Sequence, residues 1–312
     1  MGQKSKLTET TAIAAVLSCT AELIAPNVDV KAMAEATPKF EGITLAAAGG
    51  GVTIEAGQRF VTIGTVAIVP IRGILTPNSF VLEDWFGWTT YHGLTQTCDT
   101  LAADESITAV ILDVDSPGGH VLGLEGAALS LSALNAVKPV YVIADPMAAS
   151  AAYWLASQAG EISVAPGGEI GSIGVMRGGA WPVKTGSHGW KESFHISTHA
   201  QAKMPNPETE AGLAEIQRRG DEMEARFHQA VAAGRGITVD ELLVKAGVDG
   251  DPKRGGAMFP ADRAVEVGLA DRVETRRAFY ARIFEAHKPP QVMRQGASAQ
   301  RAAEVATAIS QT

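Results

Sequence analysis

The amino-acid sequence predicts an α/β protein with a parallel sheet that is covered by helices on both faces. Two observations lead to this prediction. Short apolar, β-branched runs alternate with segments of helical spacing, as in sheets whose parallel strands are joined by helices. Glycine is also abundant, at 33 of 312 residues, and pairs of glycines follow some of the strand-like runs.

The expected elements follow one another in a regular order. The run at residues 61–71 predicts a buried strand or hairpin, and residues 91–103 have helical spacing. Further strands are expected at residues 109–115, 139–144 and 162–165, and helices at about residues 123–136, 150–158, 208–233 and 264–269. A sharp turn is expected at residues 116–119, because proline and two glycines follow the strand there.

The chain divides into three expected regions. Residues 1–59 are interpreted as an N-terminal extension, residues 60–275 as the main domain, and residues 276–312 as a flexible C-terminal tail rich in proline, glutamine, serine and alanine. The apolar run at residues 12–17 favours a surface helix over a secretory signal peptide. Glutamates flank this run, and no small-residue cleavage site follows it.

The composition excludes several classes of protein. A chain with 46 % hydrophobic and 19 % charged residues is not intrinsically disordered. A net charge of -8 argues against a general nucleic-acid-binding protein. Cys19 and Cys98 cannot form a disulfide framework or a cysteine-rich zinc site, and no spacing of His, Cys, Asp and Glu predicts a metal site. No uninterrupted apolar run of about 18 residues predicts a membrane span.

The first segment with chemical significance contains Gly118 and Gly119, between a predicted strand and a predicted helix. A backbone of this kind can direct N–H groups at a common centre and bind an oxyanion or a phosphate. The pattern of a phosphate-binding loop is absent from these residues. The structural alternative is a tight turn without a chemical role.

The second segment contains Ser150, which lies at a strand-to-helix junction between alanines. Small neighbours allow a substrate backbone to approach the hydroxyl, and the start of a helix stabilises negative charge. The structural alternative is that Ser150 is an N-cap residue.

The third segment contains Ser172, followed at a distance by Lys203. A serine nucleophile needs a base, and a lysine can act as one when it is neutral. Removal from water lowers the pKa of a lysine, and Ala202 and Met204 offer apolar neighbours. The alternative is that Lys203 is an ordinary hydrated surface lysine.

Together these segments resemble the SppA-type signal peptide peptidase family of Ser-Lys serine peptidases, and they are most similar to its phage branch, the protein C head-maturation proteases. The resemblance rests on residues 112–119 (LDVDSPGG), 147–154 (MAASAAYW) and 171–175 (GSIGV). It extends through similar segments at residues 231–236 and 264–271. It implies a ClpP/crotonase-like spiral of repeated ββα units in the main domain.

The resemblance also implies roles for individual residues. Ser150 matches the nucleophile of the family, Lys203 its general base, and Ser172 the hydroxyl that orients the lysine. Gly118 and Gly119 match the oxyanion hole. No metal or other cofactor is implied.

Alternatives to the base remain open. The glycines that are common around the lysine in relatives are missing near Lys203, so Lys184 and Lys191 are rival candidates. A histidine base in a Ser-His-Asp arrangement is a further alternative. The histidines considered for it are His120, His188, His195 and His199.

The function implied by the resemblance is a serine endopeptidase of phage or prophage capsid maturation. Its substrates would be scaffold, portal or capsid proteins, and the alanines around Ser150 predict a small, apolar pocket before the scissile bond. A homo-oligomer in the host cytoplasm or the prohead is implied, without secretion, nucleic-acid binding or stable membrane insertion. The alternatives are a bacterial peptidase that degrades signal peptides, a catalytically silent assembly or scaffold component, and a crotonase-type acyl-CoA enzyme.

Overall fold

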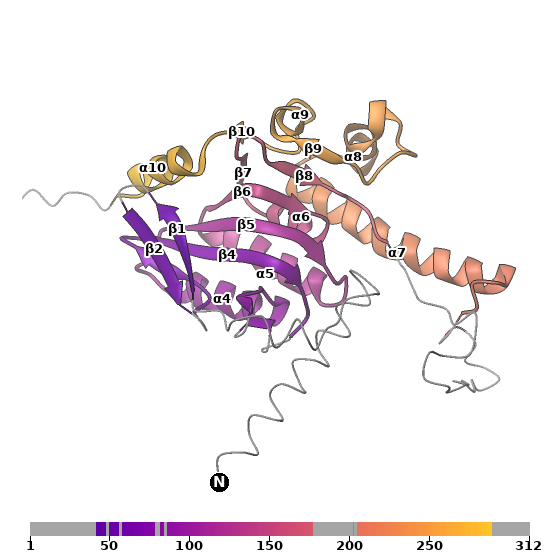
Figure 1. Ribbon diagram of the computed structural model, residues 1–312, viewed down its shortest axis with the longest axis horizontal. Helices are drawn as coiled ribbons and strands as arrows, with labels where there is room; N and C mark the ends of the chain where they lie inside the picture. Colours follow the sequence, from indigo (N-terminus) through magenta and orange to yellow (C-terminus); the bar gives the residue numbers. More distant parts are fainter. Residues whose placement is uncertain are drawn as a thin grey trace, which may run out of the picture.

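The computed structural model describes residues 42–47, 50–55, 58–78, 82–83, 86–176, 202 and 205–288. In this part of the chain, an eight-stranded sheet lies between helices, and a separate two-stranded sheet is formed by β1 (Gly42–Ala47) and β2 (Gly50–Glu55) (Figure 1). The α/β class predicted from the sequence is confirmed.

The strand order in the central sheet is β10-β7-β6-β5-β4-β3, and β8 joins β6 to β9. All pairs are parallel except β3–β4 and β8–β9. The strands are β3 (Val61–Ile63), β4 (Val66–Leu75), β5 (Ala109–Gly119), β6 (Val140–Ala149), β7 (Glu161–Val164), β8 (Glu169–Gly171), β9 (Met258–Pro260) and β10 (Arg272–Val273). Parallel strands that are covered on both faces need continuous apolar runs, which β4 and β5 provide.

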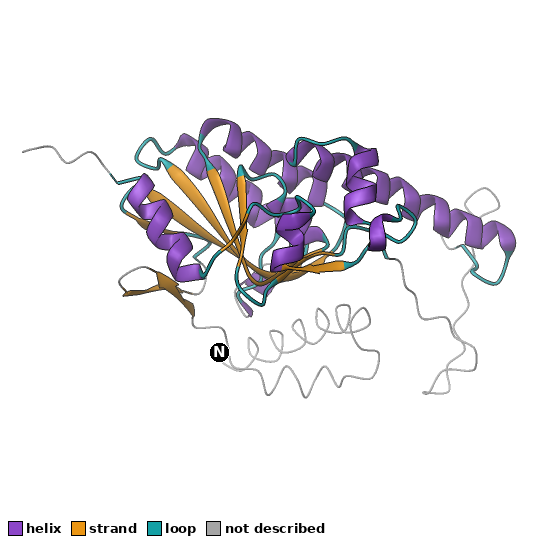
Figure 2. Cartoon of the chain, turned by 90° about the horizontal axis from the view of Figure 1, so that it is seen from above, coloured by secondary structure: helices purple, strands orange, loops and turns teal. Residues whose placement is uncertain are grey.

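Helices connect the parallel strands from β4 to β7. The described helices are α4 (Tyr91–Ala103), α5 (Leu124–Val137), α6 (Ala151–Ala156), α7 (Glu210–Gly234), α8 (Val239–Ala246), the 3-10 helix η2 (Val248–Gly250), α9 (Ala261–Glu266) and α10 (Arg276–Ala286). Helices α4, α5 and α6 follow β4, β5 and β6 and pack along one face of the sheet (Figure 2). In the described part of the chain, no helix has the length and apolar character needed to cross a bilayer.

The larger core cluster lies between the sheet and this helical layer. Its helical members include Leu101 of α4, Leu131 of α5 and Trp154 of α6. The ring of Trp154 stacks on Phe227 of α7 with 4.8 Å between centroids, which fixes α7 against α6. Helix α7 is thereby held next to the turn that precedes α6.

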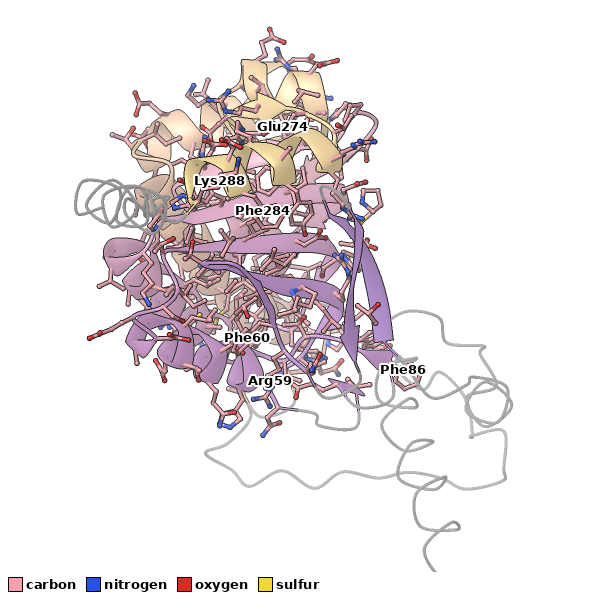
Figure 3. The ribbon with its side chains drawn as sticks, turned by 90° about the vertical axis from the view of Figure 1, so that its left-hand side faces the viewer. Arg59, Phe60, Phe86, Glu274, Phe284 and Lys288 are labelled. Atoms are coloured by element: carbon pink, nitrogen blue, oxygen red, sulfur yellow. The ribbon has the colours of Figure 1, made fainter. Side chains whose placement is uncertain are left out.

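The opposite face of the sheet is covered by α10, whose residues Phe279, Tyr280 and Ile283 belong to a second core cluster. Figure 3 shows this side of the molecule, with Phe284 on α10 and Glu274 just before the helix. From the sequence, residues 276–312 were expected to form a flexible tail, whereas residues 276–286 form α10. The buried aromatic residues explain the difference. Residues 289–312, residues 1–41 and the expected surface helix at 12–17 lie outside the described residues.

A buried carboxylate fastens α10 to the sheet. The Asp113 side chain is inaccessible to solvent, and its Oδ1 atom accepts hydrogen bonds from Arg72 and Arg276. The hydroxyl of Tyr280 donates to Oδ2 at 2.7 Å. Three donors therefore compensate one charge on β5, as a buried carboxylate requires.

Strands β5 and β6 run further than the sequence suggests. The prediction of a sharp turn at residues 116–119 is wrong, because β5 continues to Gly119. Gly118 and Gly119 pair with Ile74 and Leu75 of β4. The register shifts between Val114 and Ser116, and Gly118 has a φ of 102°. Glycine accepts this conformation, so the strand can bend without ending.

Candidate active site

The carboxyl ends of β4, β5, β6 and β8 meet at one edge of the sheet, and a cleft of about 1200 Å³ opens there. Gly118, Gly119, Ser150 and Ser172 all line this cleft. Its other walls come from α7, α8 and the loop before β9, and α7 projects past the strand ends (Figure 1). The structure thus brings together four of the five predicted site residues. The fifth, Lys203, lies outside the described residues.

Ser150 occupies a strained turn between β6 and α6. Its backbone has φ 53° and ψ -123°, and its N–H donates to the Gly171 carbonyl oxygen at 2.8 Å. A non-glycine residue in such a region costs about 1–3 kcal/mol unless its surroundings enforce it. Its side chain makes no capping hydrogen bond to α6, so the N-cap interpretation does not account for this serine.

Gly118 makes room for the Ser150 turn. A Cβ atom at Gly118 would lie 2.7 Å from the Ser150 Cβ and 2.9 Å from the Ala151 nitrogen. A Cβ atom at Gly119 would lie 2.0 Å from the Leu75 carbonyl oxygen. These distances are too short for any side chain, so glycine is required at both positions.

The backbone amides at the end of β5 have different partners. The Gly118 N–H donates to Ser116 Oγ at 3.1 Å, and Ser116 Oγ donates to the Gly73 carbonyl oxygen at 2.6 Å. The His120 N–H donates to the Leu75 carbonyl oxygen at 2.9 Å. Both amides are therefore engaged on the β4 side of the strand.

Ser172 lies beside Ser150 because their strands are paired. Ala149 and Gly171 are register partners in β6 and β8, so each serine directly follows one member of this pair. Neighbouring strands lie about 4.8 Å apart. Ser172 also has a positive φ, of 53°, and its N–H donates to the Ala257 carbonyl oxygen at 2.8 Å. Both serines therefore point from fixed backbone positions into the same cleft.

The predicted lysines cannot be placed. Lys203 and its rivals Lys184 and Lys191 lie outside the described residues, as do His188, His195 and His199. Of the lysines that the structure describes, Lys253 lines the cleft, from an exposed loop before β9. His120 also lines the cleft, next to Gly119.

Two further cleft residues, Glu224 and His228 on α7, were not identified from the sequence. Burial lowers the pKa of His228, although Glu224 and a hydrogen bond with the Ile173 backbone act in the opposite direction. The ring is therefore neutral at pH 7. Their spacing of four residues on a predicted helix was the available signal, since it places both side chains on one helical face.

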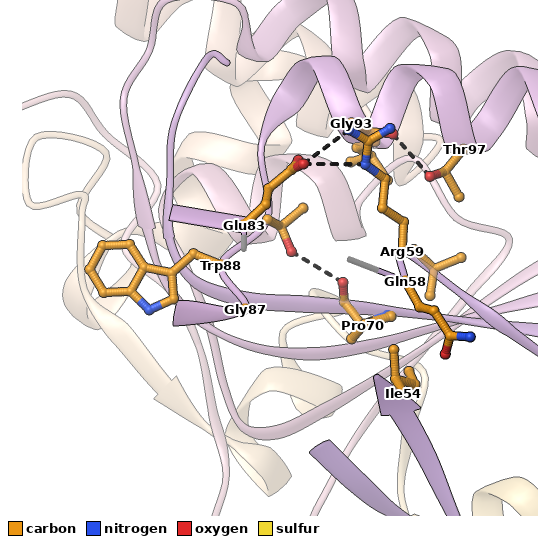
Figure 4. A pocket seen from close by; sticks show the side chains of 12 residues that line it. Ile54, Gln58, Arg59, Pro70, Glu83, Gly87, Trp88, Gly93 and Thr97 are labelled. Carbon is orange, nitrogen blue, oxygen red and sulfur yellow. Dashed lines mark hydrogen bonds and ion pairs between the residues drawn. The ribbon is translucent and has the colours of Figure 1, made fainter. Parts of the chain in front are cut away.

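A second pocket lies beside the middle of β4, where Pro70, Ile54 and Trp88 line it (Figure 4). Its volume is about 50 Å³, which holds only a few water molecules. The charged groups at its edge bind each other, with Arg59 donating to Glu83 at 2.9 Å. Neither Ser150 nor Ser172 lines this pocket, so the larger cleft is the candidate active site. Within the described residues, no group of three or more His, Cys, Asp or Glu side chains could hold a metal ion.

Comparison with known proteins adds to this geometry. The model of peptidase family S49 matches residues 132–288. The chain is 28% identical over 237 residues to capsid assembly protease C of Escherichia phage lambda, covering 74% of this chain and 51% of that protein. It is 30% identical over 214 residues to head-tail preconnector protein GP5 of Enterobacteria phage P21, covering 67% and 40%.

A bacterial relative covers a shorter region. Protease 4 of Salmonella typhi is 35% identical over 114 residues, which is 36% of this chain and 18% of that protein. The chain spans about half the length, or less, of these curated relatives.

Proposed function

The chain belongs to peptidase family S49, and on this basis we propose that it is a serine endopeptidase with Ser150 as its nucleophile. The observation that carries the proposal is that Ser150 occupies a strained turn in a large cleft. The neighbouring residue, Gly118, has no side chain that could overlap this turn. A hydroxyl on such a turn is open to a substrate carbonyl.

We assign the general base to Lys203, on the resemblance of its segment to the family. The neutral lysine amine takes the Ser150 Oγ proton as Oγ bonds to the substrate carbonyl carbon. Collapse of the tetrahedral intermediate breaks the C–N bond, and the lysine ammonium returns the proton to the leaving amine. Water, deprotonated by the same lysine, then hydrolyses the acyl-enzyme. Ser172, which lies beside Ser150, is proposed to hold the lysine amine by a hydrogen bond.

The oxyanion would be bound by backbone amides of Gly119 and Ala151. The flanking amides of Gly118 and His120 are engaged toward β4, and alternate N–H groups of an extended chain point in opposite directions. The Gly119 amide is thus expected to point toward Ser150. The Ala151 N–H begins α6, where helical amides have no intrahelical acceptor. In this proposal, Gly118 leaves room for the Ser150 turn and does not donate a hydrogen bond to the oxyanion.

The substrate class is proposed from the relatives. Two relatives come from phages, and they are named a capsid assembly protease and a head-tail preconnector protein. We therefore propose that this enzyme acts in the host cell or the prohead on scaffold, portal or capsid proteins, as a homo-oligomer. Residues 60–275 are proposed to form the peptidase domain, with α10 completing its fold.

The test is co-expression of the chain with a candidate scaffold protein, followed by analysis of both proteins for cleavage. Wild type is expected to cleave the scaffold or itself, and Ser150→Ala is expected to cleave neither. Ser132→Ala, an exposed serine of α5, is the matched control and should behave as wild type. Full proteolysis by Ser150→Ala would refute the serine mechanism. A wild type that cleaves nothing would favour a silent assembly component.

A further inference from the structure

One wall of the cleft carries a carboxylate that pairs with no residue described by the structure. Glu224 of α7 lines the cleft, and its Oε1 atom lies 3.2 Å from the position that a Cβ atom would take at Gly174. Any side chain at residue 174 would press on this carboxylate. With glycine at residue 174, the carboxylate keeps its position without having to shift away from a side chain there.

Glu224 differs from its neighbours on α7. Glu222 forms an ion pair with Arg218 at 2.5 Å, and Asp221 accepts a hydrogen bond from Gln217 at 2.7 Å. Glu224 has no hydrogen bond or ion pair with any residue that the structure describes. The carboxylate in the cleft is thus the one that retains its capacity to bind a donor.

The basic residues that the structure describes on α7 and in the loop before β9 form no ion pair with Glu224. Arg226 is turned toward α5, where it pairs with Glu125 at 3.0 Å. His228, one turn along α7, is neutral at pH 7 because burial lowers its pKa. Lys253 belongs to the exposed loop on another side of the cleft and forms no ion pair with Glu224 within 4.0 Å. Within the described residues, the Glu224 carboxylate is thus left without a cationic partner.

The position of Glu224 relative to the serines indicates which part of a peptide would meet it. Residues 172–176 leave β8 along the cleft wall, and Gly174 is two residues beyond Ser172. Two residues of chain span at most about 7 Å, so the Cα atom of Gly174 lies within that distance of the Cα atom of Ser172. Consider a peptide that lies along this segment with its scissile carbonyl at Ser150. The side chain that reaches Glu224 would then belong to a residue two or three positions from the scissile bond.

We infer that Glu224 is a specificity-determining residue that binds a lysine or arginine side chain of the peptide, two or three residues from the bond that is cut. The inference rests on the proposed function, since it takes the cleft to be a peptide-binding site. The inferred substrate specificity then has two parts. The alanines around Ser150 would favour a small residue at the scissile bond, and Glu224 would favour a basic residue two or three positions away.

Binding to the Ser150→Ala protein tests the inference without requiring cleavage. The probes are short fluorescent peptides of alanine and serine in which one lysine is moved position by position, each matched by a glutamine peptide. At one position, the lysine peptide is expected to bind about tenfold more tightly than its partner, as a charged hydrogen bond predicts. Adding Glu224→Gln should remove this difference, whereas Glu222→Gln on the same helix should preserve it.

The outcomes separate the inference from the proposed function. Equal binding of lysine and glutamine peptides at every position overturns the inference, and so does a lysine preference that survives Glu224→Gln. Failure of all peptides to bind also overturns it. Proteolysis that persists in Ser150→Ala refutes the nucleophile instead, and leaves the binding result to decide on Glu224.

Discussion

The Cα atom of Gly118 lies so close to Ser150 that a Cβ atom at residue 118 would come 2.7 Å from the Ser150 Cβ. Residue 118 is at the end of β5, and residue 150 follows the end of β6. The contact therefore joins two neighbouring strands at the proposed nucleophile. It makes the geometry of Ser150 depend on a residue that has no side chain.

Gly118→Ala is expected to abolish peptidase activity and to lower the free energy of unfolding by about 2 kcal/mol or more. The new methyl group would overlap Ser150, and alanine is also strained at the φ of 102° found there. Gly126→Ala on the surface of α5 is the control, because nothing lies within 4 Å of the added Cβ. Activity assays and urea unfolding of both variants check this prediction. A stable, fully active Gly118→Ala protein would contradict it.

Ser172→Ala is expected to reduce kcat about tenfold to a hundredfold with little change in stability. The backbone bond from the Ser172 N–H to Ala257 would remain, and only the hydroxyl proposed to orient the lysine would be lost. The measurements are steady-state kinetics and thermal unfolding. Unchanged kcat would show that Ser172 does not hold the base.

Lys203→Ala is expected to eliminate cleavage, whereas Lys253→Ala should retain it. A lysine base must be neutral, so activity should rise with pH as the amine loses its proton. A pH–rate profile of wild type and both variants provides the test. If Lys203→Ala were active and Lys253→Ala inactive, the base would belong to the loop before β9. If both were active, Lys184 and Lys191 would be the next candidates.

Asp271→Asn is expected to destabilise the fold by about 1 kcal/mol at pH 7, since the partly exposed carboxylate is screened by water. Asp271 accepts hydrogen bonds from Arg235 at 2.7 Å and from the Ile162 N–H at 2.7 Å. Burial tends to raise the pKa of Asp271, but these bonds outweigh it and hold the pKa below its usual value. The stabilisation is therefore complete above the unfolded-state pKa of about 3.9 and is lost as pH falls through the lower folded-state value.

Urea unfolding of wild type and Asp271→Asn at neutral and acidic pH measures this effect. The difference between the two proteins should shrink in acid. Asp249→Asn, which removes an exposed ion pair with Arg254, is the control and should change stability by less than about 0.5 kcal/mol. A difference that is constant with pH would show that the Asp271 charge is not responsible.

Asp113→Ala is expected to cost about 3–5 kcal/mol, because it would leave two arginines without their buried partner. Tyr280→Phe removes one donor to the same carboxylate and should cost about 1–2 kcal/mol. Chemical denaturation of both variants gives the two values. Tyr141→Phe, at a less buried hydroxyl, is a suitable comparison. Equal losses for Asp113→Ala and Tyr141→Phe would contradict the proposed importance of the buried network.

The sequence predicted those features that depend on local patterns. The strand–helix alternation from β4 to β7 follows from apolar runs and helical spacing, and it is confirmed. Ser150, Ser172 and the two glycines lie in recognisable segments, and the structure collects them in one cleft. Their catalytic roles remain predictions, and so does the role of Lys203.

Features that depend on distant contacts were missed. The length of β5 is set by the pairing of Gly119 with Leu75. Helix α10 is held by the hydrogen bond from Tyr280 to Asp113, two residues that are 167 positions apart in the sequence. Neither relationship leaves a short-range pattern. In the sequence, Glu224 looks like the other acidic residues of a charged helix. The fold shows that it lies against Gly174 and pairs with no residue that the structure describes.

The hydrogen bond from Ser172 to Ala257 also has a consequence in time. The ribosome adds Ser150 and Ser172 to the chain before Ala257. A nascent chain can therefore contain both serines before the Ala257 carbonyl, which accepts the hydrogen bond from the Ser172 N–H, has been synthesised. The β8–β9 pairing likewise waits for residues 258–260. The cleft can therefore be completed only after residues 257–260 have been synthesised, so a nascent chain that already contains both serines still lacks the complete site.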